Sequence, residues 1–155
     1  MAVPRKVLNF LKKSKIKFEI IRHKKVFTAF DKSQTLKVPQ KIVGKTLVLK
    51  VDKKLVLVLI PADKKLDFRK LKKLGKRVKL ASERLIKNKL KGIKVGAVPP
   101  FGILWKIPTI VDTSFKKQKE IILNSGDWFH SIKISPKNLQ KIIPDLVWQK
   151  ISLKK

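Results

Sequence analysis

The chain contains no cysteine and only two histidines, His23 and His130, among its 155 residues. The lack of cysteine excludes disulfide bonds, thiolate nucleophiles and cysteine-based zinc sites. Two histidines are too few for a histidine-rich metal site, so we expect neither a metal nor another cofactor. The G-x-S-x-G, H-E-x-x-H and P-loop motifs are also missing from the sequence. An enzyme with this sequence must therefore use backbone groups, a lysine or the substrate itself.

Long hydrophobic runs are missing as well. The longest apolar run, residues 55–62, has about eight residues, whereas a helix that crosses a bilayer needs roughly 20. The start of the chain contains no apolar segment typical of a signal peptide. We therefore expect a cytoplasmic protein with no membrane partner, folded as a single domain over residues 1–155.

Acidic residues are scarce relative to basic ones. Ten aspartates and glutamates stand against 40 lysines and arginines, which gives a formal net charge of +30. Such an excess attracts polyanions, with nucleic acid as the first candidate and a membrane surface as the second. Arginine is rare, so nearly all of this charge comes from lysine. A general compositional bias toward lysine is the alternative explanation, since it requires no ligand.

The first half of the sequence predicts two helices, a strand and a β-hairpin. Apolar residues at helical spacing indicate a helix at about 3–11, and residues 17–23 are typical of a short strand. Thr28, followed three residues later by Asp31, is a typical helix start. Two β-branched apolar runs within residues 41–62 flank the turn sequence DKK, which indicates a hairpin. The second run is apolar on both faces, so we expect it to be a central strand.

The second half mixes strands and helices without a regular βαβ repeat. Residues suited to the start of a helix are Asp67, Ser82 and Ser135, the last followed by a proline at the first helical position. Helices are therefore expected at 67–75, where Gly75 ends the helix, at 82–90, and from 135 onward. Strands are expected at 77–81, 108–112, 119–126 and 128–135. This order indicates an α+β fold with a mixed, strongly curved, barrel-like sheet surrounded by helices.

The eight residues VGAVPPFG, at positions 95–102, form an uncharged segment in a basic chain. They hold two of the six glycines and two of the eight prolines. Glycine allows a backbone to approach a ligand closely, and proline holds a loop in one shape. The segment is therefore a candidate for a stiff binding loop, with a plain tight turn as the alternative.

Four stretches, in this order and at these separations, resemble a known family. They are HKKVFTAFD with His23 and Thr28, IVGKTLVLK with Lys45, GIKVGAVPPFG with Gly96 and Pro100, and TIVDTSF with Asp112. Together they resemble the YbaK/EbsC-type aminoacyl-tRNA editing domain, which also occurs as the editing insertion of bacterial-type prolyl-tRNA synthetases. The likeness covers most of the chain, from about Phe18 to Ile143.

The resemblance implies a free-standing hydrolase that acts in trans and removes wrong amino acids from tRNA. The implied partners are a mischarged tRNA and an aminoacyl-tRNA synthetase, and we expect a monomer. The implied catalytic residues are Lys45, Gly96 and Pro100. The implied substrate-binding residues are Thr28, Ala97, Val98, Pro99, Asp112, Gly126 and His130. Family members often have histidine where Ile103 follows the loop, so a role for a histidine there is in doubt.

Each of these residues also has a structural alternative. Lys45 could be a solvated lysine at a strand start, Thr28 a helix cap, and Asp112 a cap for the turn that follows it. His23 is expected to be structural, and His130 either structural or part of a pocket. The three tryptophans are expected in the core or at its rim, with stacking on a base as the alternative: Trp105, Trp128 and Trp148.

The most basic segment is Lys64–Lys79, with nine basic residues in sixteen. If Phe68, Leu71 and Leu74 face the core, its lysines remain in water and form a surface suited to the phosphates of a tRNA acceptor stem. The lysines expected to bind tRNA are Lys70, Lys72 and Lys73.

The chemistry implied by the resemblance suits the residues. An aminoacyl ester is already activated, so its hydrolysis needs a positioned water and donors for the developing oxyanion, which backbone N–H groups can supply. The role expected of Lys45 is electrostatic, in contact with the terminal adenosine or its phosphate. A non-catalytic RNA-binding protein that keeps the editing fold is the competing hypothesis. The amino acid removed stays open between alanine, cysteine, serine and threonine.

Overall fold

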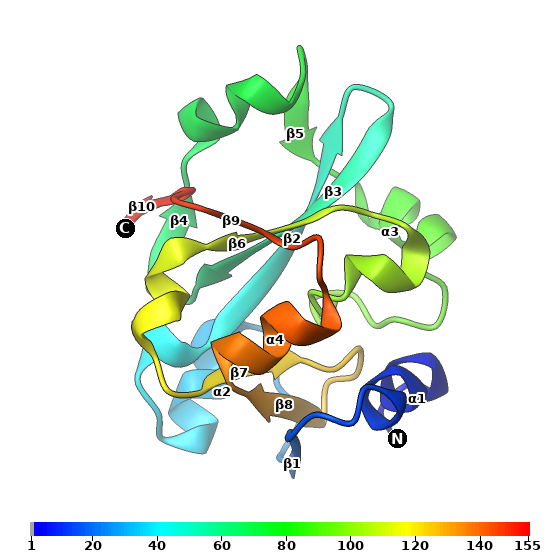
Figure 1. Cartoon of the computed structure of the whole chain (residues 1–155), viewed down its shortest axis with the longest axis vertical. Helices are drawn as coiled ribbons and strands as arrows, with labels where there is room; N and C mark the ends of the chain where they lie inside the picture. Colours follow the sequence, from blue (N-terminus) through cyan, green and yellow to red (C-terminus); the bar gives the residue numbers. More distant parts are fainter. Residues whose placement is uncertain (1) are drawn as a thin grey trace.

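The structure is a computed structural model that describes residues 2–155 (Figure 1). Its α-helices are α1 (Arg5–Lys13), α2 (Ala29–Leu36), α3 (Glu83–Lys89) and α4 (Pro136–Ile142). Its longer strands are β1 (Glu19–Arg22), β2 (Gly44–Val51), β3 (Lys54–Pro61), β6 (Thr109–Asp112), β7 (Ile121–Asn124) and β8 (His130–Ile134). Three-residue strands are β4 (Lys64–Leu66), β5 (Val78–Leu80), β9 (Val147–Gln149) and β10 (Ser152–Lys154). Short 3-10 helices are η1 (Gln40–Ile42), η2 (Phe68–Leu74), η3 (Gly102–Trp105) and η4 (Thr113–Lys117).

The largest sheet has the strand order β5-β2-β3-β6-β9. It is mixed, because β2 pairs antiparallel with β3 and β5, whereas β6 pairs parallel with β3 and β9. The predicted hairpin is confirmed as β2 and β3, and β3 is the central strand, as its apolar character on both faces predicts. The α+β fold with a mixed sheet is confirmed.

The expected single curved sheet is divided into parts. A second, antiparallel sheet has the order β1-β8-β7, and a third pairs β10 with β4. One parallel bridge, between Val43 and Ile122, connects the start of β2 to β7. In Figure 1 the β1-β8-β7 sheet lies below the long β2–β3 hairpin, with α1 and α4 beside it.

Two apolar cores lie on opposite faces of the largest sheet, because successive side chains of a strand point to opposite sides. On β3, Leu57 and Leu59 belong to the main core, while Val58 and Ile60 belong to the second core. The main core also contains Val98, so the uncharged loop is part of the packing of the whole domain.

The predicted helix at 67–75 is corrected by the structure. Residues 68–74 form the 3-10 helix η2, in which the N–H of Lys70 donates to the carbonyl of Asp67 three residues earlier. Of the three apolar residues expected to face the core, only Leu71 is buried, whereas Phe68 and Leu74 are 42% and 36% exposed. The segment is short and reaches the second core only at its middle, so its ends remain at the surface.

The predicted helix starts at Thr28, Ser82 and Ser135 are confirmed. In each case the side-chain oxygen accepts a hydrogen bond from the backbone N–H three residues later, at 3.0–3.1 Å. Within residues 2–155, no helix is both long and apolar enough to cross a membrane.

Candidate functional site

The loop at 95–102 turns its apolar side chains inward. Ala97 and Val98 are 3% and 4% exposed, Phe101 is fully buried, and the two prolines between them are buried as well. These side chains pack in the protein and are not free to contact a ligand. What the loop can offer a substrate is therefore its backbone, especially at Gly96, which is exposed.

Gly96 has the conformation that favours glycine, with φ = +80°. A Cβ atom at this position would lie 3.1 Å from the carbonyl oxygen of Phe27. The loop between β7 and β8 contains Gly126, with φ = +102°. The carbonyl of Gly126 accepts a hydrogen bond from the N–H of Lys94 at 2.9 Å. Gly126 therefore lies against the segment that leads into the 95–102 loop.

A pair of aromatic rings borders the same loop. Trp128 donates its indole N–H to the carbonyl of Val95 at 2.8 Å, and Phe27 packs edge-on against Trp128 with ring centroids 5.1 Å apart. Phe27 is 53% exposed. The Nζ atoms of Lys25 and Lys94 lie 4.8 and 5.6 Å from the Trp128 ring centroid. We call Phe27, Trp128, Lys25 and Lys94 the aromatic–lysine cluster.

Two small cavities flank this cluster. One, of about 420 Å³, is lined by Trp128 and by Lys87 and Lys94. The other, of about 280 Å³, is lined by Phe27, Lys25 and residues of α2. An exposed Phe27 ring beside a partly exposed Trp128 ring, with ammonium groups around them, suits a ligand that combines flat bases with phosphates.

A buried polar chain connects α2 to the loop. Lys32, 4% exposed, donates from Nζ to Oδ1 of Asn124 at 2.6 Å, and Nδ2 of Asn124 donates to the carbonyl of Val98 at 3.3 Å. Burial lowers the pKa of Lys32 to about 7. Sequence reasoning missed both side chains. The available signal was the position of Lys32 on the same helix face as Ala29 and Leu36.

Two histidines lie at the end of the β1-β8-β7 sheet. Nε2 of His23 is 2.8 Å from Oγ of Ser131, and Nδ1 of His130 is 3.0 Å from Oδ1 of Asp127. Burial lowers the pKa of His23. Burial also raises the pKa of Asp127, but hydrogen bonds from His130 and from the N–H of Phe129 outweigh it and hold that pKa below its usual value. His23 and His130 thus have structural partners, which fits the structural alternative for both.

Lys45 does not join the loop. It is half-buried in β2, and burial, reinforced by the charge of Lys155 and opposed by that of Asp63, lowers its pKa. Side-chain alternation places it on the face of Leu47, which packs on the second core, whereas Val98 packs in the main core. Among residues 2–155, no hydrogen bond or ion pair connects Lys45 to the loop.

Asp112 and Thr28 both act as caps. Asp112 is 1% exposed, and its carboxylate accepts from the N–H of Ile151 at 2.9 Å and from the N–H and hydroxyl of Ser114. Burial raises the pKa of Asp112, and these hydrogen bonds outweigh that effect and lower it. Thr28 caps α2 and is exposed next to Phe27, so it borders the loop as well.

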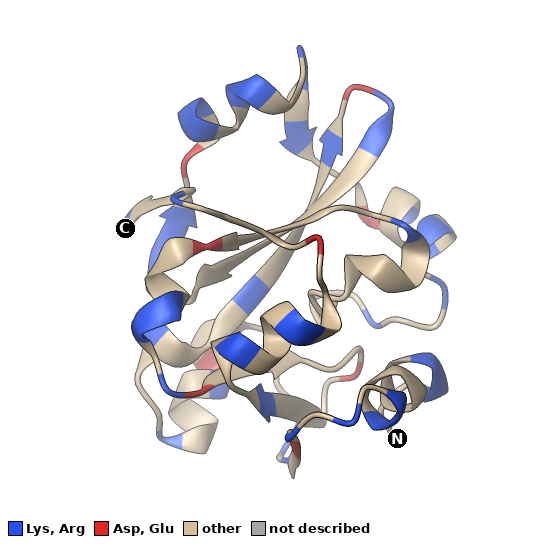
Figure 2. Cartoon of the chain, viewed as in Figure 1, with Lys and Arg blue, Asp and Glu red and all other residues tan. Residues whose placement is uncertain are grey.

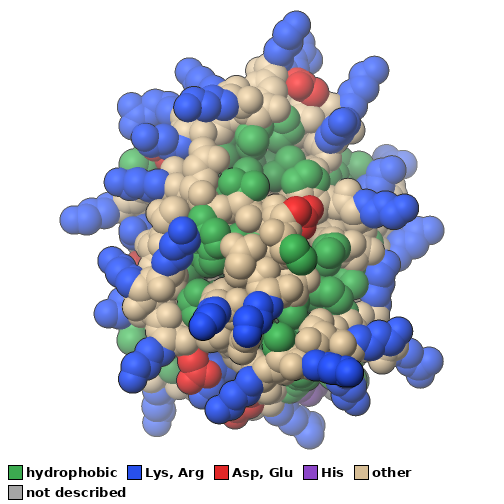
Figure 3. Space-filling view, viewed as in Figure 1, with side chains coloured by type: hydrophobic (Ala, Val, Ile, Leu, Met, Phe, Trp, Pro, Cys, Tyr) green, Lys and Arg blue, Asp and Glu red, His purple; other side chains and the backbone are tan. Residues whose placement is uncertain are grey.

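The three lysines expected to bind tRNA, Lys70, Lys72 and Lys73, are all exposed on η2. They are not a separate patch, because lysine and arginine occur on nearly every element (Figure 2) and project all around the face in Figure 3. Charge alone therefore does not single out one tRNA-binding surface.

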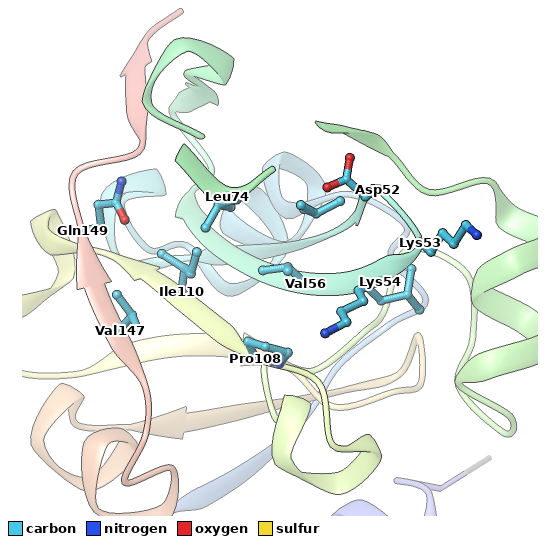
Figure 4. Close-up of a pocket in the computed structure, with 11 residues that line it drawn as sticks. Asp52, Lys53, Lys54, Val56, Leu74, Pro108, Ile110, Val147 and Gln149 are labelled. Carbon is cyan, nitrogen blue, oxygen red and sulfur yellow. The ribbon is translucent and has the colours of Figure 1, made fainter. Parts of the chain in front are cut away.

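A larger cavity lies away from the loop. It has a volume of about 670 Å³ and is lined mainly by apolar side chains of β3, β6, β9 and η2, with Lys53 and Lys54 at its edge (Figure 4). None of the residues that line it belongs to the loop or to the aromatic–lysine cluster. Within the described residues, no group of three or more histidine, aspartate or glutamate side chains could hold a metal ion.

Comparisons with known proteins agree with this architecture, a small α+β domain that carries a preformed loop. A family model described as the aminoacyl-tRNA editing domain matches residues 23–142. The chain therefore belongs to the aminoacyl-tRNA editing domain family, as the sequence motifs predicted. A comparison with curated proteins gives no match.

Two solved structures share the fold over nearly their whole length. One, described as hypothetical protein APE2540, is 25% identical, with a TM-score of 0.86 over 96% of this chain and 100% of that one. The other, described as a candidate trans-editing enzyme for prolyl tRNA synthetase, is 20% identical, with a TM-score of 0.85 over 100% of this chain and 99% of that one.

Proposed function

We propose that this protein is a free-standing trans-editing hydrolase that deacylates mischarged aminoacyl-tRNA. Membership of the editing-domain family supports a tRNA-linked substrate, and the likeness to a candidate trans-editing enzyme supports action in trans. The observation that carries the proposal is the 95–102 loop: Gly96 is exposed with φ = +80°, while the residues after it are buried and fixed. This is a preorganised backbone at an accessible point.

In this proposal, water attacks the carbonyl carbon of the aminoacyl ester at the loop. The bond between that carbon and the ribose oxygen breaks, the ribose oxygen takes up a proton, and the products are free amino acid and tRNA. The backbone N–H groups of the loop that precede its two prolines, at Gly96 and Val98, orient the ester and stabilise the charge that develops on its carbonyl oxygen. Because the ester is already activated, the reaction requires no strong side-chain nucleophile.

The aromatic–lysine cluster is the place we propose for the unpaired 3′ end of the tRNA. Bases stack on Phe27 and Trp128, and Lys25 and Lys94 neutralise the neighbouring phosphates. Lys45 faces Asp63 and Lys155 instead of the loop, which favours an electrostatic contact with the tRNA over a role at the ester carbonyl. The loop, the cluster and Lys45 belong to one chain, so we propose that the protein acts as a monomer. Besides the mischarged tRNA, the proposed partner is the synthetase that makes it.

A non-catalytic RNA-binding protein is the second candidate function. It is favoured by the lysines and arginines that occur on nearly every element (Figure 2), since such a surface binds RNA without any catalytic loop. The deciding experiment measures the release of amino acid from tRNAs mischarged with alanine, cysteine, serine or threonine. Turnover of at least one substrate supports the hydrolase. Binding of all of them without any release beyond spontaneous hydrolysis supports the RNA-binding protein.

A further inference from the structure

Lys32 is the one buried lysine among residues 2–155. Burying an ammonium group is unfavourable unless it is hydrogen-bonded or loses its proton, and every other described lysine avoids this situation. Lys32 lies in α2 one turn after its cap, Thr28, and points toward the end of β7, where its Nζ is 2.6 Å from Oδ1 of Asn124. A lysine in such a position needs an explanation other than surface charge.

The contact fixes the orientation of the Asn124 amide. A charged lysine has only donors and no acceptor, so the amide oxygen of Asn124, and not its nitrogen, faces Nζ of Lys32. The amide nitrogen then faces the carbonyl oxygen of Val98, 3.3 Å away, and donates to it. Without Lys32 the amide could turn over, and two carbonyl oxygens would face each other.

Val98 lies in the middle of the loop and has few other polar partners. The next two residues, Pro99 and Pro100, have no N–H groups, so they cannot anchor the loop by donating hydrogen bonds. The nearest backbone hydrogen bond within the loop runs from the N–H of Ala97 to the carbonyl of Lys94. The Asn124 side chain therefore supplies the polar contact that holds the Val98 peptide.

We infer that Lys32 is a positioning residue of the loop: it orients the Asn124 amide, which holds the Val98 carbonyl and thereby the shape of the Gly96–Pro100 backbone. The inference rests on the proposed function for its catalytic consequence, because the loop that it positions is the one that binds the ester. Lys32 itself does not touch the substrate, since its side chain is buried behind Asn124.

The test compares two variants that break different contacts in the series from Lys32 through Asn124 to Val98. Lys32→Met keeps an unbranched side chain that is one atom shorter and removes the donor to Asn124. Asn124→Asp leaves Lys32 a carboxylate partner, so the buried charge stays paired, but it removes the donor to Val98. Lys41→Met, which removes an exposed lysine from η1, is the matched control.

For both Lys32→Met and Asn124→Asp we expect kcat for deacylation to fall at least about tenfold, since small displacements of a catalytic backbone are costly. KM for tRNA should change less than about twofold, because these side chains do not contact the tRNA. Lys41→Met should keep both constants. If Asn124→Asp retains the parental kcat, the Asn124–Val98 contact does not position the loop and the inference is wrong.

Amide hydrogen exchange gives a readout that needs no turnover. In both variants the amides of residues 95–102 should exchange at least about tenfold faster, while those of β3 keep their parental rates. Unchanged exchange in the loop overturns the inference even if kcat falls. A parent protein that deacylates no substrate contradicts the proposed function, and the exchange experiment then still decides whether Lys32 positions the loop.

Discussion

The indole nitrogen of Trp128 donates a hydrogen bond to the carbonyl of Val95 at 2.8 Å, across 33 positions of the sequence. The same indole ring contacts Phe27 edge-on. One tryptophan thus both anchors the entrance of the loop and presents an aromatic surface next to it. These two roles can be separated by substitution.

Trp128→Phe keeps an aromatic ring but removes the N–H group, whereas Trp128→Leu removes both. If bases stack on this ring, Trp128→Leu should raise KM for tRNA by about tenfold, because stacking on an aromatic side chain contributes about 1–3 kcal/mol per base. Trp128→Phe should retain most of the binding and lower kcat through a looser loop. Steady-state kinetics on one mischarged tRNA measures both effects. Equal KM values for the two variants would exclude stacking on Trp128.

Gly96→Ala can be compared with a matched control, Gly92→Ala. Both glycines have positive φ, +80° and +87°, so each alanine should destabilise the protein by about 1–2 kcal/mol. A Cβ at Gly92 has open space, whereas one at Gly96 meets the carbonyl of Phe27 at 3.1 Å. We expect kcat to fall at least about tenfold in Gly96→Ala only, measured alongside urea unfolding. Equal rates would show that the substrate does not approach the backbone at Gly96.

Lys45→Ala tests the residue that the family resemblance implies. We expect deacylation to fall at least about tenfold, mainly through KM, because the role proposed for Lys45 is electrostatic contact with the tRNA. The contact should weaken with added salt, so the difference from the parent should shrink at high ionic strength. Rates measured at several salt concentrations check this. Parental turnover by the folded variant would remove Lys45 from the site.

The surface at η2 is tested by replacing Lys70, Lys72 and Lys73 with glutamine. Phosphate contacts release counterions, so this variant should show a higher KM and a flatter dependence of binding on salt, with a smaller change in kcat. The matched control replaces three exposed lysines near η4, namely Lys116, Lys117 and Lys119. If both triple variants behave alike, tRNA binding depends on overall charge and not on η2.

Lys32 should also make stability depend on pH. Its pKa is about 7 in the folded protein, lowered from 10.5 by burial. Between these two values the unfolded chain binds more protons than the folded one, so the free energy of unfolding should rise with pH in this window. Below about pH 7 both states are protonated and this gain is lost.

Lys32→Met lacks that titration. The stability of the parent relative to Lys32→Met should therefore increase by at least about 1.4 kcal/mol, the equivalent of one pKa unit, between about pH 7 and about pH 10. Urea unfolding of both proteins across this range measures the difference, in which the titrations of the other lysines cancel. A difference that does not change with pH would mean that Lys32 stays charged when buried.

Sequence reasoning succeeded where the pattern is local. The β2–β3 hairpin follows from two β-branched runs around a turn, and the starts of three α-helices follow from capping side chains. The 95–102 loop could be recognised because glycine permits unusual backbone conformations and proline restricts the backbone, and both act within a few residues. The four family motifs then indicated which residues, in which order along the chain, are candidates for the site.

What the sequence could not predict depends on partners that are distant in the chain. The strands β9 and β10 have three residues each, too few for a period-two pattern, and they form by pairing with β6 and β4. Lys32 has its partner 92 positions away, and a lysine is placed at the surface by default. The clustering of Phe27 with Trp128 likewise arises only when two loops meet.

The late position of β9 has a consequence for synthesis of the protein on the ribosome. β6 is buried on both faces and lies between β3 and β9. Until residues 147–149 have left the ribosome, β9 cannot form, so β6 has a partner on its β3 edge and none on the other edge. Asp112 likewise has to wait for the N–H of Ile151. A chain that terminates before these residues would expose the free edge of an apolar strand, which favours intermolecular β-pairing. We expect such truncated products to aggregate and to require degradation or chaperone binding during translation.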